Sequence, residues 1–136
     1  MITRRHILGS AFLAPLVAIL PGARGSRVLA ATKTKACARS AVPVGTGKVF
    51  TVSGRPYLIS QPSAGTFRAF RASCTHAGCT LPSPSLGKIR CGCHGAQFNG
   101  LTGANTAGPG GSRAGTVGSL PSVSVSVDAT YVYVTV

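Results

Sequence analysis

Two short segments of the sequence contain both cysteine and histidine. The first reads CTHAGC, from Cys74 to Cys79, and the second reads CGCHGAQF, from Cys91 to Phe98. Thiolate and imidazole groups are common ligands of transition metals and iron–sulfur clusters. Each segment offers one Cys and one His at close spacing plus one further Cys, and fourteen residues separate His76 from Cys91. The pattern indicates a metal centre built from two loops.

Several kinds of site use these side chains, and the spacing bears on each. A c-type haem site needs Cys-x-x-Cys-His, and the second segment is one residue too short for it. A zinc ion could take two Cys and two His in a tetrahedron, although the Cys-x-His spacing is unlike that of a common zinc finger. That reading would also leave two cysteines over. A catalytic Cys–His pair gives no reason for two such segments.

The two segments together resemble the Rieske family, whose motif is Cys-x-His-x-Gly-Cys followed by Cys-x-Cys-His-Gly. The resemblance implies one [2Fe–2S] cluster, with two cysteines on one iron and two histidines on the other. Carried over by position, Cys74 and Cys91 would bind one iron. His76 and His94 would bind the other. Because imidazole donates less charge than thiolate, such a cluster is easier to reduce than one held by four cysteines.

The resemblance also implies roles for the remaining residues of the two segments. Cys79 and Cys93 would form the disulfide that joins the two cluster loops in exported members of the family, and disulfides persist outside the cytoplasm. Gly78 and Gly95 would let the backbone approach the cluster sulfides and donate N–H bonds to them. Residues 108–110, Gly-Pro-Gly, fall where the family has a proline-containing loop over the cluster.

Three positions depart from the quinol-oxidising members of the family. In those proteins the second segment continues with a Ser and, two residues later, a Tyr, whose hydroxyls donate hydrogen bonds to a cluster sulfide and a cysteine sulfur. Ala96 and Phe98 stand at these positions and have no donor. We therefore expect a midpoint potential well below roughly +300 mV, the upper end of the Rieske range. Ala77 replaces a leucine that follows the first histidine in many of those members, which weakens the prediction of direct quinol oxidation.

The charge of the chain is strongly one-sided. Among 136 residues there are 14 Lys plus Arg and a single acidic residue, Asp128, for a net charge of +13. One carboxylate excludes the paired-carboxylate chemistry of glycoside hydrolysis. The positive field would attract nucleic acid, anionic lipid or an acidic protein. Scattered bases without a recognition helix or stacking aromatics argue against nucleic acid, so a solvated cationic surface is the simplest interpretation.

The composition predicts an all-β fold. The chain contains 18 Gly and 9 Pro, which would interrupt a helical bundle. Short strand-like runs occupy residues 48–53, 56–60 and 66–73. Residues 123–127 and 131–136 alternate valine with polar or aromatic residues around a turn at 128–130, which predicts an antiparallel hairpin with one buried valine face. The Rieske resemblance implies a small antiparallel β-sandwich or barrel with a cluster-binding loop subdomain at about 73–119.

The chain divides into three predicted segments. Residues 1–30 read as a twin-arginine (Tat) export signal or membrane anchor, because Arg4 and Arg5 precede an apolar run from Ile7 to Leu20. Membrane association would involve residues 7–23, although the run is short for a stable span. Residues 31–47 are small and basic and read as a flexible linker. Residues 48–136 form the predicted Rieske domain. Cys37, in the linker, would be a free thiol or form an intermolecular bridge.

These observations predict one-electron transfer through a [2Fe–2S] cluster, with no independent substrate site apparent. The first interpretation is the iron–sulfur subunit of a membrane-associated quinol oxidoreductase, with cytochrome b or c-type partners and possibly quinol. The alternative is the small Rieske subunit of an extracytoplasmic oxidoreductase of the arsenite oxidase type. An interpretation from another class is a zinc-stabilised binding module without redox function. A ring-hydroxylating enzyme is not expected, because the chain is too short for its second iron domain.

Overall fold

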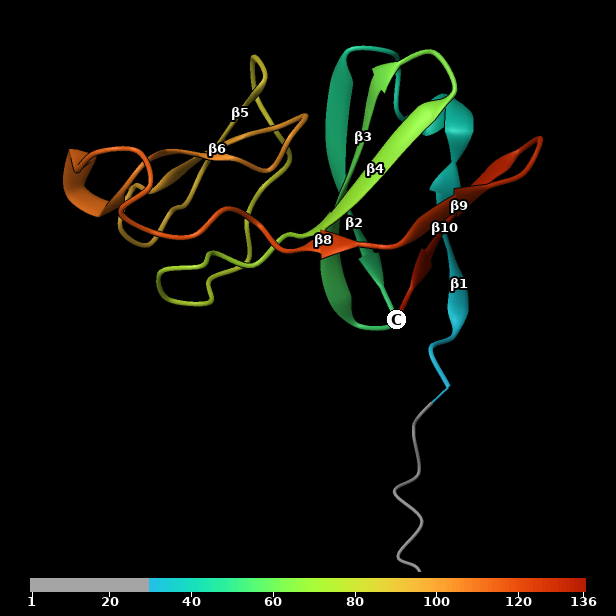
Figure 1. Ribbon diagram of the computed structural model, residues 1–136, viewed down its shortest axis with the longest axis horizontal. Helices are drawn as coiled ribbons and strands as arrows, with labels where there is room; N and C mark the ends of the chain where they lie inside the picture. The colour runs from blue at the N-terminus through green and yellow to red at the C-terminus, as the bar shows by residue number, and fades with distance from the viewer. Residues whose placement is uncertain (1–29) are drawn as a thin grey trace, which may run out of the picture.

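The computed structural model describes residues 30–136, in which nearly all regular structure is β (Figure 1). The strands are β1 (Lys33–Ala38), β2 (Thr46–Val52), β3 (Arg55–Ser63), β4 (Thr66–Arg71), β5 (Lys88–Arg90), β6 (Gln97–Asn99), β7 (Asn105–Ala107), β8 (Ser122–Val123), β9 (Val125–Val127) and β10 (Tyr131–Thr135). Two single-turn 3₁₀ helices, η1 (Arg39–Ala41) and η2 (Pro109–Gly111), complete the list. The predicted all-β class is confirmed.

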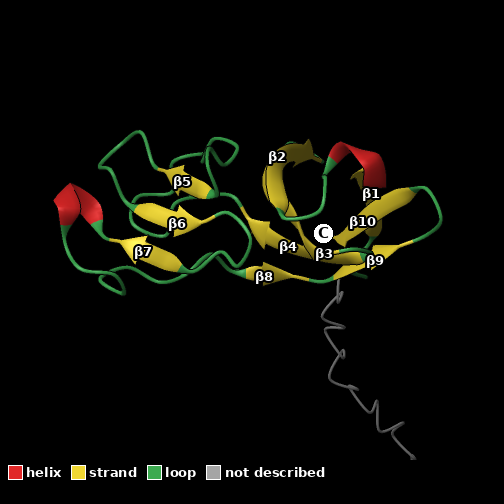
Figure 2. Cartoon of the chain, turned by 90° about the horizontal axis from the view of Figure 1, so that it is seen from above, coloured by secondary structure: helices red, strands yellow, loops and turns green. Residues whose placement is uncertain are grey.

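The strands form three antiparallel sheets in two parts. One part, the base, contains a sheet of order β1-β10-β9 and a sheet of order β2-β3-β4-β8. The other part, the cluster-binding subdomain (residues 73–119), contains the sheet of order β5-β6-β7. Because the chain leaves the base after β4 and returns at β8, the subdomain is an insertion between two paired strands (Figure 2). The two Cys/His segments both lie in this insertion.

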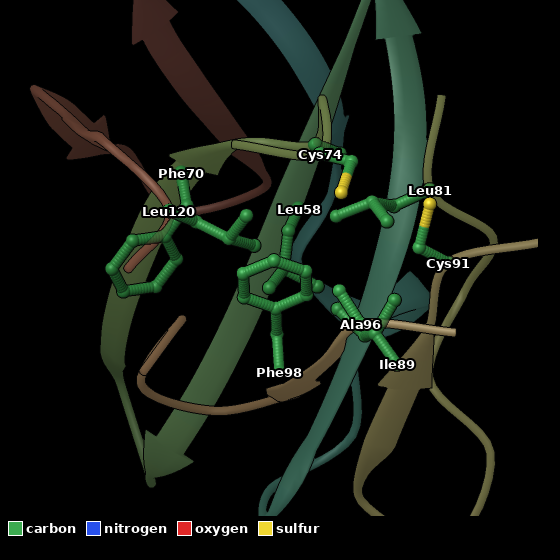
Figure 3. Packing of buried hydrophobic residues seen from close by; sticks show 10 residues of the cluster. Leu58, Phe70, Cys74, Leu81, Ile89, Cys91, Ala96, Phe98 and Leu120 are labelled. Carbon is green, nitrogen blue, oxygen red and sulfur yellow. The ribbon is translucent and has the colours of Figure 1, made fainter. Parts of the chain in front are cut away.

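Strand β3 is the wall that the two parts share. Tyr57, Leu58 and Ile59 are all fully buried, so both faces of the strand are covered. Tyr57 and Ile59 pack into the core of the base with Val132 and Val134 of β10. Leu58 points to the opposite face and packs into the core that underlies the Cys/His segments (Figure 3). A continuous apolar run is what a strand covered on both faces requires.

The segment interpreted as a flexible linker is part of the folded base. Residues 31–47 contain β1, η1 and the start of β2. Strand β1 pairs antiparallel with β10, with Lys33 opposite Thr135 and Lys35 opposite Tyr133. The linker prediction was therefore wrong. Lysines and small residues gave no apolar alternation in this segment, and the partner strand that orders it lies about a hundred residues away along the chain.

Cys37 is buried in the core of the base, with 8% of its surface exposed. Burial raises the pKa of its thiol to about 11, although the nearby Lys48 ammonium acts in the opposite direction. A buried, protonated thiol is a poor nucleophile. The side chain therefore contributes packing, and the position does not suit the intermolecular bridge that the sequence left open.

The predicted C-terminal hairpin is present, but its valines do not all share one buried face. Strand β9 pairs with β10, and Val132 and Val134 are fully buried. Val127 is 42% exposed, and Val123 lies in β8, where it pairs with Ala69 of β4. The short segment around residue 124 thus passes from one sheet to the other, which a simple alternation pattern does not reveal.

The turn of this hairpin is organised by the single carboxylate of the chain. Asp128 accepts hydrogen bonds from the Tyr133 hydroxyl at 2.6 Å and from the amides of Thr130 and Tyr131 at 2.8 and 2.6 Å. These bonds, the Tyr133 bond foremost, lower the pKa of Asp128 to about 2. The Asp128 side chain therefore stabilises this turn of the base.

The predicted export signal or anchor at residues 1–30 lies almost entirely outside the described residues. Within residues 30–136, no helix has the length and apolar character that crossing a membrane demands.

Candidate metal centre

The two Cys/His segments fold into loops with the same hydrogen-bond pattern. In the first cluster loop (residues 74–79), the Cys74 amide donates to the Cys79 carbonyl at 2.8 Å, and the Gly78 amide donates to the Cys74 carbonyl at 2.7 Å. In the second cluster loop (residues 91–96), the Cys91 amide donates to the Ala96 carbonyl at 2.8 Å, and the Gly95 amide donates to the Cys91 carbonyl at 3.0 Å. The two loops are thus equivalent turns, each beginning at a cysteine.

The glycines are required by this turn geometry. Gly78 has a φ of 73° and Gly95 a φ of 80°, in the left-handed region where a side chain is unfavourable. The amides of both glycines donate to the carbonyl of the loop's own cysteine, and their expected bonds to cluster sulfides stay a prediction. Closure of the turn, four residues after each cysteine, determines where these amides point.

The two cysteines that begin the loops share a dry environment. Cys74 and Cys91 are 3% and 2% exposed, and both are free thiols. They belong to one apolar core that also contains Ala96 and Phe98, both fully buried (Figure 3). Leu81 lies between the two thiols in the same view. The two thiols thus lie on equivalent loops and in one apolar core.

The two histidines lie on the solvent side of the loops. His76 and His94 are both exposed, and their ring centroids are 4.8 Å apart in an edge-on arrangement. The centre therefore has a buried side made by thiols and an exposed side made by imidazoles. The side chain beside the first histidine, Ala77, is also exposed and small.

The expected disulfide between Cys79 and Cys93 is confirmed and ties the two loops together. The half-cystines are 14 residues apart in sequence, with their Cα atoms 6.6 Å apart. The sulfur atoms of Cys79, Cys91 and Cys93 lie within 4.8 Å of one another. These three do not form a metal site, because the disulfide removes two of the thiolates that would be ligands. Cys91 alone of the three remains available.

A third segment closes over the second cluster loop. The Gly110 amide of η2 donates to the His94 carbonyl at 2.8 Å. Gly108 allows the backbone at residue 108 to lie close to Thr116, because a Cβ on residue 108 would be 2.9 Å from the Thr116 Cβ. Across the other loop, the Thr75 hydroxyl donates to the Gly118 carbonyl at 2.5 Å. The Gly-Pro-Gly segment thus lies against the second cluster loop, and its expected place over a bound cluster stays a prediction.

The donors fit the group that the resemblance implies. A Rieske cluster needs two thiolates on one iron and two imidazoles on the other. The structure supplies two buried thiols and two adjacent exposed imidazoles on symmetric, cross-linked loops. Cys74 and Cys91 could hold one iron, and His76 and His94 the other. Such a group, when bound, would accept and release one electron.

One residue near the site escaped the sequence reasoning. The Arg90 guanidinium lies over the second cluster loop, where a Cβ on Gly95 would be 3.6 Å from an Arg90 terminal nitrogen and 3.8 Å from its Nε. In the sequence, Arg90 is one of 14 basic residues and only its position directly before Cys91 distinguishes it. The contact depends on the pairing of β5 with β6, which the sequence does not display.

Comparisons with known proteins agree with this geometry. The model of the Rieske [2Fe–2S] domain family matches residues 32–123, which include β1 and both cluster loops. No match was found among curated proteins. The family match places the start of the domain at about residue 32, in agreement with the folding of the former linker into the base.

Solved structures with the same fold include a ferredoxin, a plasma membrane Rieske protein and a dioxygenase. The ferredoxin of carbazole 1,9a-dioxygenase from Nocardioides aromaticivorans IC177 is 22% identical, with a TM-score of 0.53 over 76% of this chain and 97% of that chain. The plasma membrane Rieske protein PetC3 from the cyanobacterium Synechocystis PCC 6803 is 27% identical, with a TM-score of 0.52 over 65% of this chain and 86% of that chain. Naphthalene 1,2-dioxygenase is 20% identical, with a TM-score of 0.64, but only 26% of that chain is covered.

The symmetric cross-linked loops, the donor set and the family match over residues 32–123 lead to one assignment, which supersedes the zinc-stabilised module. This chain belongs to the Rieske [2Fe–2S] family and is an all-β electron-transfer protein with one [2Fe–2S] cluster.

Proposed function

We propose that Cys74 and Cys91 hold one iron of the cluster and that His76 and His94 hold the other. The observation that carries this assignment is the pairing of two buried thiols with two exposed imidazoles 4.8 Å apart. In this arrangement the thiols keep their iron away from water, whereas the imidazoles face the solvent. Electrons would therefore enter and leave through the histidine side.

We infer that the protein relays electrons between protein partners at a potential below that of quinol-oxidising relatives. Ala96 and Phe98 are fully buried in the same core as Cys74 and Cys91, so the wall against the thiols has neither of the hydroxyl donors expected in those relatives. Donors to the sulfurs stabilise the reduced state, and their absence lowers the potential. The partner in this role would be a larger oxidoreductase with its own catalytic centre, of the arsenite oxidase kind or another.

Oxidation of quinol in a membrane complex is the second candidate function. Two exposed histidines on the solvent side of the cluster loops favour it, because a quinol donor could reach them from solvent. The plasma membrane Rieske protein PetC3 has the same fold. Exposed Ala77, in place of the bulky leucine of many quinol-oxidising members, argues for the first candidate.

We also propose that the protein works outside the cytoplasm, on the extracytoplasmic side of a membrane. The Cys79–Cys93 disulfide supports this location, since such bonds persist in oxidising compartments. The pair Arg4-Arg5 before an apolar run supports a Tat-type route, which exports folded proteins. Fractionation of cells that express the full chain tests the location, and an Arg4→Lys, Arg5→Lys variant should accumulate in the cytoplasm.

A potentiometric titration with a quinol assay tests the choice between the two functions. The midpoint potential of the purified protein is measured by titration, with the reduced cluster followed by EPR. The oxidised protein is then mixed with decylubiquinol. The relay function predicts a midpoint well below roughly +300 mV and no reduction by the quinol. A midpoint near that value together with rapid reduction would instead assign the quinol-oxidising function.

A further inference from the structure

One exposed line of the cluster-binding subdomain has features that the fold itself does not need. It follows β5, an edge strand of the sheet β5-β6-β7. The line begins at Leu86 in the turn before the strand, continues through Lys88 and Arg90, and ends at the second cluster loop beside His94. We call it the β5 stripe. Figure 1 shows the turn before β5 projecting from the subdomain.

Leu86 is unfavourable for the free protein in two respects. Its side chain is fully exposed, at 100%, which makes it the most exposed large apolar side chain among residues 30–136. Its φ is 49°, and the following Gly87 has a φ of 74°, so both residues of this two-residue turn are left-handed. Such turns favour Asn-Gly, and a branched apolar residue is disfavoured there. A leucine held in this way contributes nothing to the core that could offset its exposure.

The two cations of the stripe share one face. Lys88 and Arg90 are exposed whereas Ile89 between them is fully buried, as expected for alternate residues on a strand. Ser85 and Lys88 close the turn with two backbone hydrogen bonds of 2.8 and 3.0 Å, so Leu86 is held at a fixed end of the strand. From Lys88 to Arg90 the strand covers about 7 Å at the usual rise per residue.

The far end of the stripe meets the metal centre. The terminal nitrogen of Arg90 lies 3.6 Å from where a Cβ on Gly95 would be, and Gly95 directly follows His94. The sole acidic side chain, that of Asp128, lies in the base and accepts a hydrogen bond from Tyr133. No acid of this protein therefore neutralises the cations of the stripe.

We propose that the β5 stripe docks an acidic redox-partner protein, with Leu86 inserting into an apolar depression on the partner and Lys88 and Arg90 facing its carboxylates. This inference rests on the proposed electron-transfer function. The cations lead to the imidazole side of the centre, where an electron must leave, so the attracted surface has to carry a redox group of its own. A protein meets that need and a lipid surface does not. Complementary charge speeds encounter and sets orientation, and a central apolar anchor supplies affinity.

The probe is oxidised plastocyanin, an acidic blue-copper protein. The dithionite-reduced holoprotein, freed of excess dithionite, gives one electron to Cu(II), which yields Cu(I) and the oxidised cluster. Stopped-flow absorbance at low and high salt gives the second-order rate constant. We expect the wild-type rate to fall at least about tenfold as salt screens the charges. A Lys88→Glu, Arg90→Glu variant should lose at least about tenfold at low salt and most of its salt dependence.

A matched control separates the stripe from the overall charge. Lys33 and Lys35 are exposed, lie two residues apart on β1, which is also an edge strand, and belong to the base. Their double replacement by Glu changes the net charge equally, and we expect less than about a threefold effect on the rate. Equal losses in the two double variants would overturn the proposal. Midpoint potentials of all variants are measured, so that a change of driving force is not mistaken for a change of docking.

Leu86→Asn tests the apolar anchor without stressing the turn, because Asn favours left-handed backbone. We expect the rate to fall several-fold with the salt dependence retained. A rate unchanged by this substitution would overturn the role of Leu86. Loss of binding to vesicles of phosphatidylglycerol and phosphatidylcholine, with an unchanged rate, would assign Leu86 to a lipid surface and also overturn the proposal. A protein that cannot be reduced at all would refute the proposed function itself, whereas a reducible protein with charge-independent rates would refute only the docking.

Discussion

At the scale of single residues, the donor-free wall beside the thiols is the feature that most affects function. Ala96 and Phe98 are fully buried with Cys74 and Cys91, so their side chains face the thiol side of the centre rather than solvent. The sequence motif defines the ligands, but these flanking positions determine how much the reduced state is stabilised. The same ligands can therefore operate over a wide range of potential.

Ala96→Ser should raise the midpoint potential. A hydroxyl that donates to a cluster or cysteine sulfur stabilises the more negative, reduced state. A gain of about 1.4 kcal/mol in that state corresponds to a rise of roughly 60 mV for one electron. Redox titration of the purified variant measures the shift. Ala69→Ser, which buries a hydroxyl in the base core, is the control and should leave the potential unchanged. Equal potentials for wild type and Ala96→Ser would contradict the role of this position.

Cys37 should make stability depend on alkaline pH. Burial raises the pKa of its thiol from 9.0 to about 11, so the unfolded state loses this proton first. The stability linked to Cys37 is complete below pH 9 and is lost as the pH rises from about 9 to 11. Cys37→Val removes the titrating group and should flatten that part of the profile. Denaturant unfolding of the holoprotein at several pH values measures it, and parallel profiles for the two proteins would contradict the burial of this thiol.

At the scale of elements, the role of β1 depends on contacts that are distant along the chain. The strand is ordered by pairing with β10, and its outward lysines lie over tyrosine rings of that strand, Lys35 at 3.6 Å from the Tyr131 centroid and Lys33 at 5.2 Å from that of Tyr133. These pairs cover the outer face of the sheet and contribute to its stability in proportion to how well they exclude water. The base is thus closed by its own N-terminal strand.

Limited trypsin digestion should show that β1 is folded. A flexible, basic linker would be cut rapidly after Lys35 and Arg39, whereas paired strand backbone does not enter a protease site without local opening. We expect these bonds to survive in the native protein and to be cut readily after denaturation. Mass spectrometry of the fragments identifies the cleaved bonds. Cleavage after Lys35 at similar rates in the two states would restore the linker interpretation.

The disulfide should control how firmly the two cluster loops hold together. Cys79 and Cys93 close a loop of 14 residues, and a cross-link of that size is worth about 3 kcal/mol. In a Cys79→Ser, Cys93→Ser variant, the loops lose their covalent link, and visible absorbance of the cluster should decay much faster in guanidinium. Cys37→Ser is the control for loss of a cysteine. Equal decay rates in the double variant and the wild type would show that the η2 segment holds the loops without the disulfide.

The elements that sequence reasoning found are those with local signals. The strands around Phe50, Leu58 and Phe70 have apolar runs bounded by turn residues, and the two Cys/His segments have a spacing that few sites share. Strand β1 and the transfer of Val123 to another sheet were missed, because both depend on pairing between distant segments. The turn-closing bonds of the glycine amides were also missed, since the motif reports residue types and not the direction in which an N–H points.

At the scale of the whole molecule, β3 connects folding to function. One face of β3 packs into the core of the base. On the other face, Leu58 packs into the core that contains the two thiols. The subdomain can therefore be precise at the metal centre although its own strands are only three residues long. The net charge is +13, and the one acidic side chain, Asp128, is exposed and accepts a hydrogen bond from Tyr133, so the surface charge is predominantly positive. That surface favours partners of opposite charge.

The central claim is that Cys74 and Cys91 bind one iron of the cluster and that His76 and His94 bind the other. The most direct test is pulsed EPR of the reduced holoprotein, prepared with natural histidine and with ¹⁵N-labelled histidine. Two imidazole nitrogens on the reducible iron should give two strong ¹⁴N hyperfine couplings. In the protein with labelled histidine, ¹⁵N couplings should replace them. Cys37→Ser should leave them unchanged. A reduced cluster without histidine couplings, or a protein that binds zinc and gives no signal after reduction, would contradict the account.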